Sequence, residues 1–257
     1  MIERSEYSPL IQKVANWNKL EKGTIIRLLH VCIENGFTAF DVSGVFENQS
    51  MESSFGTALS ESGLSRDEIQ LITRINLEDM DNVEEHVEKL LLQLGVDYLD
   101  LLILEDIQDI AHSAQLLEKL STQAKLSEFG IVGLPPGPFQ ETGLKVRVFQ
   151  TSFELLSNRI LHKLEVGQSE GERWRVFIDW PVHQPSGETL NNAFTDLVKK
   201  YEVSQQDLFL LWLLQHPVSF NFMVGGNTET EIDRFGKLKQ VKLHPFDWKK
   251  IKLILTD

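Results

Sequence analysis

The chain has 257 residues, of which 42% are hydrophobic and one is cysteine, and its net charge is −13. Lys and Arg are scattered without a basic run, which excludes a nucleic-acid surface or an anionic-membrane surface. A single cysteine excludes a disulfide framework and a cysteine-based metal site. The chain opens without the apolar core of a signal peptide, and no apolar run approaches membrane-spanning length, so we expect a cytoplasmic protein. This length suits one α/β barrel or two small domains.

Apolar runs of strand length alternate with amphipathic helical patterns along the chain. The predicted strands cover residues 9–15, 37–42, 69–73, 99–104, 127–132, 146–151, 175–180 and 220–224. The predicted helices cover residues 18–35, 51–62, 79–94, 109–124, 157–165, 188–201, 204–216, 228–238 and 246–255. Asn18 is the expected N-cap of the first helix, and Gly95 ends the third. Residues 167–172 read as a surface loop, and the Pro- and Gly-rich residues 134–143 leave room for at most a short helical turn. Eight strands alternating with helices, without an internal linker, predict one (β/α)8 TIM barrel over residues 1–257.

The second predicted strand, which follows Gly36, ends in a lone carboxylate, Asp41. In α/β barrels, the C-terminal end of a parallel strand is where the chemistry is held. This makes Asp41 a candidate site residue. The alternative is that Asp41 caps the turn or helix that follows it.

Four segments of the sequence resemble the aldo-keto reductase superfamily. They are residues 36–41 with Glu52, Phe55-Gly56 and Ala58-Leu59 after them, residues 94–101, residues 125–131, and Phe149-Gln150. The resemblance implies a TIM barrel and NAD(P)-dependent reduction of carbonyl groups. It also implies a catalytic set of aspartate, tyrosine, lysine and histidine at the strand ends.

Three of these four catalytic positions depart from the family pattern. Asp41 matches the aspartate, whereas Phe46 stands for the tyrosine, Arg74 for the lysine and Glu105 for the histidine. Phe46 has no exchangeable proton, and loss of a general acid typically costs about 10²- to 10⁴-fold in rate. Arg74 keeps the positive charge, but its pKa is too high for proton transfer. We interpret Asp41, Arg74 and Glu105 as a buried charge triad left after catalysis was lost. The alternative is a rebuilt site in which one carboxyl holds a proton.

The cofactor positions that the resemblance implies are also altered. Gln150 matches the retained glutamine, while Val132-Gly133 replaces the pair that binds the nicotinamide carboxamide. The aromatic residue that stacks on nicotinamide aligns with Asp179, or with Trp180 if the alignment shifts by one residue.

The phosphate loop of the family aligns with Gly225, Gly226, Asn227 and Thr228, where a helix N-terminus can still hold an anion. The alternative is that Gly225-Gly226 is only a tight turn. The basic residue that contacts the 2′-phosphate falls on Thr228 or Glu231, and neither is basic. These positions imply no resident cofactor, or only weak binding of NAD(P)(H).

The family's residues are replaced at both the catalytic and the cofactor positions. This favours a non-catalytic binding or regulatory protein with an unidentified small-molecule or protein partner. The alternative is an NAD(P)(H)-dependent oxidoreductase for small carbonyl or enone substrates, with a site rebuilt from Asp41, Arg74 and Glu105. The histidines lack metal-ligand spacing, so no metal is expected. Cys32 is expected to be buried and inert, and Trp174 and Trp180 to pack around the seventh strand.

Overall fold

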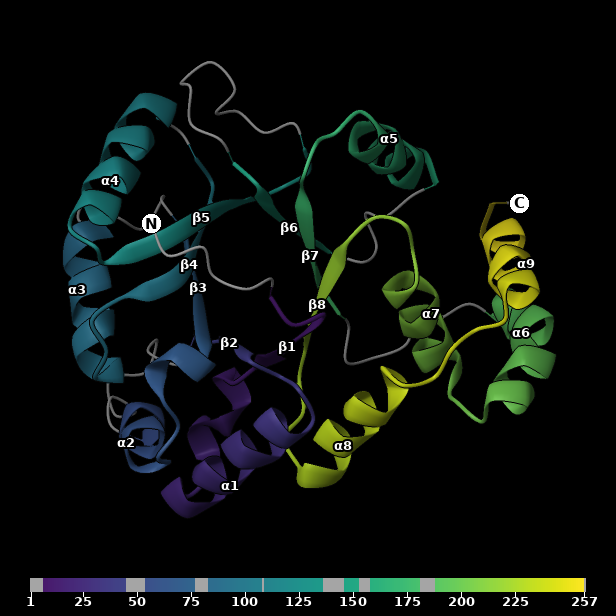
Figure 1. Ribbon diagram of the computed structural model, residues 1–257, viewed down its shortest axis with the longest axis horizontal. Coiled ribbons are helices and arrows are strands. Elements are labelled where there is room, and N and C mark those ends of the chain that lie inside the picture. Colours follow the sequence, from purple (N-terminus) through teal and green to yellow (C-terminus); the bar gives the residue numbers. More distant parts are fainter. Residues whose placement is uncertain are drawn as a thin grey trace.

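A computed structural model describes residues 7–44, 54–76, 83–107, 109–135, 146–152, 158–180 and 188–256, and they form a closed parallel barrel (Figure 1). Its strands pair in chain order, and β8 closes onto β1. The strands are β1 (Leu10–Lys13), β2 (Ala39–Asp41), β3 (Gln70–Asn76), β4 (Leu99–Glu105), β5 (Leu126–Val132), β6 (Val148–Ser152), β7 (Arg175–Asp179) and β8 (Phe220–Val224). The predicted (β/α)8 barrel is therefore confirmed.

Helices surround the barrel on its outside (Figure 1). They are α1 (Lys22–Glu34), α2 (Ser54–Glu61), α3 (Val83–Leu94), α4 (Ile110–Thr122), α5 (Asn158–Ser169), α6 (Glu188–Tyr201), α7 (Gln205–Leu214), α8 (Glu229–Leu238) and α9 (Pro245–Thr256). Within the described part of the chain, no helix is both long and apolar enough to cross a membrane.

Two local predictions were wrong. Asn18 does not cap α1, because Ala15–Lys19 forms a short 3₁₀ helix and α1 begins only after Glu21. The stretch 167–172 is not all loop, since α5 continues to Ser169. Both predictions rested on local composition, and tertiary packing overrides the weak helix preference of single residues. Most of the Pro- and Gly-rich stretch 134–143 lies outside the described residues, as do Phe46 and Glu52.

The strands have two apolar faces, because side chains alternate between the barrel interior and the surrounding helices. One cluster joins residues from every strand except β5, as expected of the interior. Its members are Tyr7, Ile11, Ala39, Ile72, Leu101, Ile103, Val148, Phe177 and Met223. The larger cluster contains the other strand face together with the helices.

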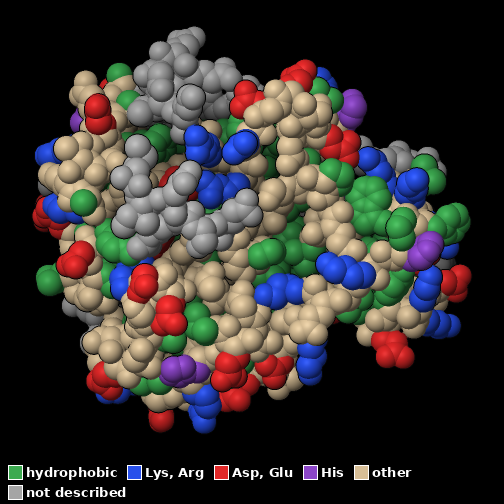
Figure 2. Space-filling view, viewed as in Figure 1, with side chains coloured by type: hydrophobic (Ala, Val, Ile, Leu, Met, Phe, Trp, Pro, Cys, Tyr) green, Lys and Arg blue, Asp and Glu red, His purple; other side chains and the backbone are tan. Residues whose placement is uncertain are grey.

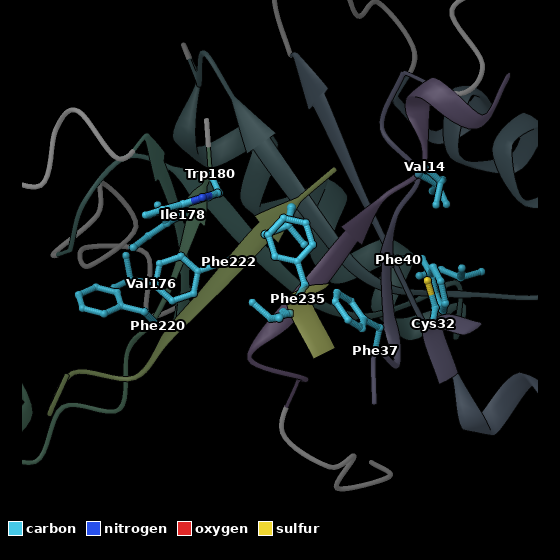
Figure 3. Close-up of a cluster of buried hydrophobic side chains, with 14 of the residues drawn as sticks. Val14, Cys32, Phe37, Phe40, Val176, Ile178, Trp180, Phe220, Phe222 and Phe235 are labelled. Carbon is cyan, nitrogen blue, oxygen red and sulfur yellow. The ribbon is translucent and has the colours of Figure 1, made fainter. Parts of the chain in front are cut away.

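Aromatic side chains fill part of this larger cluster (Figure 3). Phe222 is fully buried, and its ring meets that of Trp180 edge to face with centroids 5.6 Å apart. Trp180 thus packs around β7, as predicted. Cys32 is also fully buried in this cluster, and burial raises the pKa of its thiol far above the usual range. It is therefore inert, as expected.

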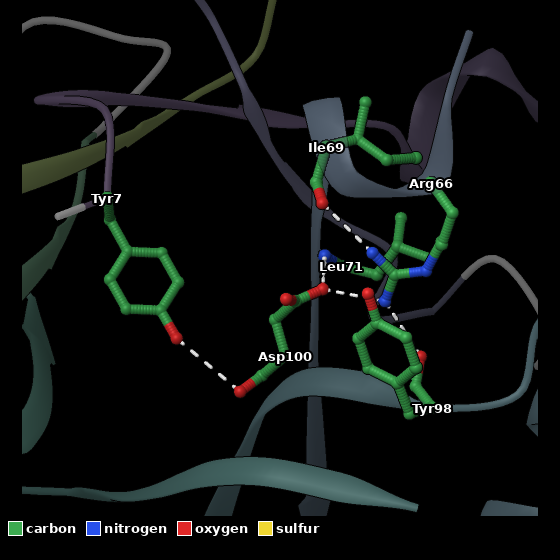
Figure 4. A network of polar contacts seen from close by, with 6 residues as sticks. All are labelled: Tyr7, Arg66, Ile69, Leu71, Tyr98 and Asp100. Atoms are coloured by element: carbon green, nitrogen blue, oxygen red, sulfur yellow. Dashed lines mark hydrogen bonds and ion pairs between the residues drawn. The ribbon is translucent and has the colours of Figure 1, made fainter. Parts of the chain in front are cut away.

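The resemblance segment at residues 94–101 has a structural role (Figure 4). The buried carboxylate of Asp100 accepts hydrogen bonds from Arg66 at 2.7 Å and from the backbone N–H of Leu71 at 2.8 Å. The Arg66 guanidinium also lies over the Tyr98 ring, 4.0 Å from its centroid. These contacts fasten the start of β4 to the start of β3.

Two glycines of the resemblance segments are required by local geometry. Gly95 ends α3 with a φ of +67°, as the sequence predicted. A Cβ at Gly56 would lie 2.2 Å from the carbonyl oxygen of Gln93, so α2 can approach the end of α3 only without a side chain at this position.

Candidate functional site

Four of the eight strands end in a charged residue. Lys13 ends β1, Asp41 ends β2, Glu105 ends β4 and Asp179 ends β7. In a parallel barrel these ends share one rim, which we call the mouth. The mouth is the candidate functional site.

Asp41 is held in a turn at the end of β2. Its side chain is buried, and its Oδ1 accepts the backbone N–H of Ser43 at 3.0 Å. The Ser43 Oγ in turn accepts the backbone N–H of Arg74 at 2.8 Å. Burial raises the pKa of the Asp41 carboxyl, although hydrogen bonding from Ser43 and the charges of Lys13 and Arg74 oppose this shift. Asp41 is therefore both a turn residue and a buried acid.

The predicted buried triad of Asp41, Arg74 and Glu105 was wrong. Arg74 forms an ion pair with Glu105 at 3.3 Å, but their side chains are 40% and 31% exposed. Asp41 makes no ion pair with Arg74, although both lie in the described part of the chain.

The stagger of the strands explains the failure of the triad. Asp41 is level with Ile72, two residues before Arg74 in β3. Glu105 is level with Asn76, two residues after Arg74. The three side chains therefore leave the barrel wall at different heights, as the shear of a closed barrel requires.

Replacing Arg74 by methionine is therefore expected to have little effect on stability. An exposed ion pair contributes about 0–1 kcal/mol. We expect the free energy of unfolding of Arg74→Met, measured by urea denaturation at pH 7, to fall by less than about 1 kcal/mol. A loss of several kcal/mol would show that Arg74 is paired in the interior after all.

A second charged pair crosses the mouth, and sequence reasoning missed its cation. Lys13 Nζ lies 2.7 Å from Asp179 Oδ1, although their strands are separated by β8. Asp179 therefore faces the mouth, whereas Trp180 packs against Phe222 in the outer cluster. Side chains alternate along a strand, so Lys13 lies on the same face as Ile11, which belongs to the barrel interior. This alternation could have predicted that Lys13 faces the mouth.

The positions expected to hold the nicotinamide ring are only partly polar. Gln150 lies buried in β6, and its Oε1 has no hydrogen-bond partner among the described residues. Such an orphaned buried acceptor fits a ligand that donates a hydrogen bond. Val132 ends β5 with a partly exposed apolar side chain, and Gly133 follows. Of the polar groups expected to bind the nicotinamide carboxamide, that of Gln150 is thus present, whereas Val132 and Gly133 replace the other two.

Backbone N–H groups at the N-terminus of α8 are already hydrogen-bonded to a side chain of the same helix. The Glu231 carboxylate accepts the backbone N–H groups of Asn227 at 2.8 Å and Thr228 at 3.1 Å. The Thr228 Oγ1 accepts the N–H of Glu231 at 3.3 Å, which completes a capping box. Glu231 thus occupies the amides that would hold a phosphate in the loop of Gly225 to Thr228. The spacing of threonine and glutamate in Thr228-Glu229-Thr230-Glu231 was the sequence signal for this box.

The two glycines of this loop precede the capping box. Hydrogen bonds from Gln12 at 3.0 Å and Trp17 at 2.8 Å hold the carbonyl of Gly226. A Cβ on Gly226 would lie 2.9 Å from the Ile232 side chain. Close packing on α8 therefore explains Gly226.

Asparagine at position 41 is expected to stabilise the protein at neutral pH. Because the folded-state pKa of Asp41 is raised above the unfolded value of about 3.9, the folded state binds more protons between these two pKa values. The stability of the wild type therefore falls as the pH rises through this window. Asp41→Asn keeps an acceptor for Ser43 and removes the titration.

Urea unfolding at pH 7 and pH 4 measures this effect. The variant should be more stable than the wild type at pH 7, and the difference should shrink at pH 4. A variant that is less stable at pH 7 would show that the charged carboxylate is needed in the fold.

Within the described residues, no group of three or more His, Cys, Asp or Glu side chains is placed to hold a metal ion.

Comparison with known proteins agrees with this geometry. The sequence model of the Aldo/keto reductase family matches residues 12–164. Glyoxal reductase of Bacillus subtilis (strain 168) is 27% identical over 217 residues, which cover 80% of this chain and 73% of that protein. The uncharacterized oxidoreductase YcsN of the same strain is 22% identical over 271 residues, which cover 93% of this chain and 90% of that protein.

The fold also matches a solved structure. The thermostable aldo-keto reductase Tm1743, in complex with the inhibitor epalrestat, superposes with a TM-score of 0.81 at 15% identity, covering 99% of this chain and 96% of that one. At this identity the match concerns the fold alone. Since the family model spans more than half of the sequence and the barrel closes as the fold requires, this chain belongs to the aldo/keto reductase family.

Proposed function

We propose that this family member has lost carbonyl reduction and acts as a non-catalytic binding or regulatory protein. The observation that carries the proposal is the Glu231 carboxylate on the amides at the start of α8. A negative charge of the protein already occupies this anion site. A cofactor phosphate would have to displace it, and two anions at one helix N-terminus repel each other.

The residues present do not fit a phosphorylated dinucleotide. Gln150 offers an acceptor to a carboxamide, but the α8 end offers a carboxylate to a phosphate. Glu229, in the same turn, is paired with Arg27 at 2.9 Å and adds a further negative charge. We therefore expect NAD(P)(H) to bind weakly or not at all.

The sequence also lacks the tyrosine that the family pattern expects as proton donor. Phe46 stands at the tyrosine position of the family. Arg74 is paired with Glu105, and a delocalised guanidinium is a poor proton donor. The charged pairs of the mouth and the acceptor of Gln150 suit a small polar ligand better than hydride transfer. An outer helix face would serve instead if the partner is a protein.

Titration with NADPH and NADH by calorimetry tests this proposal. For the wild type we expect a dissociation constant above about 100 μM. Glu231→Lys removes the competing carboxylate and supplies a cation, so NADPH should bind about tenfold more tightly or better. Glu229→Lys makes the same change of charge in the same turn without freeing the two amides, and it is the matched control. A low-micromolar constant for the wild type would refute the proposal.

The buried acid at position 41 favours a second candidate, a nicotinamide-dependent reductase with a rebuilt site. Burial favours the neutral form of Asp41, and a neutral carboxyl can donate a proton. The relatives named as reductases point to small carbonyl substrates, with glyoxal the one to assay first, and an enone second. Consumption of NADPH by the wild type that Asp41→Asn abolishes would replace the first proposal with this one.

A further inference from the structure

A cavity lies at the opposite end of the barrel from the mouth. Its volume is about 640 Å³, and residues at or just before the starts of β6, β7 and β8 line it. Its lining includes Tyr7, Arg147, Arg173, Trp174, Arg175 and Asn221. A cavity of this size accommodates a metabolite rather than a single ion. The proposed function of the mouth uses none of these residues.

The lining is basic in a protein whose net charge is −13. Three arginines line the cavity with one glutamate, Glu172. Arg175 is neutralised by Glu128 at 2.5 Å and lies 5.2 Å from the centroid of the Tyr7 ring. Tyr7 also donates its hydroxyl to Glu128 at 3.3 Å. Arg175 is therefore already part of the wall.

The other two arginines are available to a ligand. Arg147 and Arg173 are exposed, and neither forms an ion pair with any residue that the structure describes. Basic side chains gather near the middle of the face shown in Figure 2, over the starts of β6 and β7 in Figure 1. Two guanidinium groups on one cavity are suited to a phosphate or a carboxylate, which they bind by paired hydrogen bonds.

A buried acceptor in the wall points to a second contact. The Asn221 Nδ2 donates to the backbone oxygen of Ser8 at 2.9 Å and of Tyr7 at 3.3 Å, which sets the orientation of the amide. The Asn221 side chain is only 4% exposed, and its Oδ1 has no partner in the described part of the chain. Because a buried acceptor without a partner is costly, this oxygen fits a ligand that carries an N–H or O–H donor.

Aromatic surface completes the cavity. Trp174 and Phe220 line it, and the Trp174 ring is held by Phe149, with centroids 6.4 Å apart. A Cβ at Gly167 would lie 2.3 Å from the Trp174 ring, so α5 also packs closely against the indole. A flat ring can pack against such fixed aromatic groups.

The geometry points to a mononucleotide site at the N-terminal end of the barrel. Arg147 and Arg173 bind the phosphate, Trp174 packs on the base, and Asn221 Oδ1 accepts an N–H of the base. This site is separate from the mouth, and its occupation requires no nicotinamide cofactor.

Calorimetric titration of the full chain with GMP, guanosine and inorganic phosphate tests the proposal. GMP should bind about tenfold more tightly than either fragment, because only GMP contacts both the two arginines and the pair of Trp174 and Asn221. The double variant Arg147→Gln/Arg173→Gln should lose about tenfold or more of the GMP affinity. These side chains are exposed, so the variant is expected to fold. The matched control Arg27→Gln/Arg159→Gln carries the same change of net charge on α1 and α5.

Each outcome decides the proposal. Loss of GMP affinity in the first variant but not in the control supports it. Undetectable GMP binding by the wild type overturns it, and so does equal binding of GMP and inorganic phosphate, which would indicate a simple anion site. An affinity for GMP that is unchanged by Arg147→Gln/Arg173→Gln also overturns it, because the nucleotide would then bind elsewhere.

Discussion

Replacing Asp100 by alanine is expected to lower the free energy of unfolding by about 3–5 kcal/mol, the usual cost of breaking a buried ion pair. The Asp100 carboxylate is buried and accepts hydrogen bonds from the Arg66 guanidinium at 2.7 Å and the Leu71 N–H at 2.8 Å (Figure 4). Alanine would remove this counter-charge from the half-buried Arg66 guanidinium and this acceptor from the buried backbone N–H of Leu71. Urea unfolding at pH 7 measures the loss.

Two further variants separate charge from hydrogen bonding at this position. Asp100→Asn keeps an acceptor for Leu71 but removes the charge, so its stability should lie between those of the alanine variant and the wild type. Glu229→Ala breaks the exposed pair with Arg27 and should cost less than about 1 kcal/mol. Equal stability of Asp100→Ala and the wild type would show that the contact contributes nothing to the fold.

Replacing Phe222 by alanine should destabilise the barrel to a similar extent, by about 3–5 kcal/mol. Phe222 is fully buried in β8, between the Trp180 ring at 5.6 Å and the Phe220 ring at 6.2 Å. Truncation would leave a cavity that the neighbouring strands, held by their hydrogen bonds, cannot close. Because Trp180 follows Asp179, which pairs with Lys13, we also expect the mouth to become less ordered.

Chemical denaturation compared with Phe246→Ala tests this expectation. Phe246 is a phenylalanine of α9 that is mostly exposed, and its removal should change stability by less than about 0.5 kcal/mol. Similar stabilities of the two variants would mean that the barrel collapses around the missing ring and that its packing here is not specific.

The sequence by itself determined the barrel and the family. Strand-length apolar runs such as Leu99–Leu104, separated by helical periods, allow few folds other than a parallel barrel, because both faces of such strands must be covered. The segment around Tyr98 and Asp100 carried the resemblance, and its contacts with Arg66 show that it has a structural role. The burial of Cys32 could also be read from the pattern, because the face of an amphipathic helix follows directly from its period.

Only the tertiary structure decided how the charges are arranged. Asp41, Arg74 and Glu105 all follow strand signals, but the stagger of the strands sets them at different heights, and no local pattern encodes that stagger. Lys13 meets Asp179 across 166 positions of sequence. Arg147, Arg173 and Asn221 come to line one cavity because three strands begin beside each other. Periodicity specifies which face of an element is buried, whereas the packing of the whole barrel determines which distant side chains share a site.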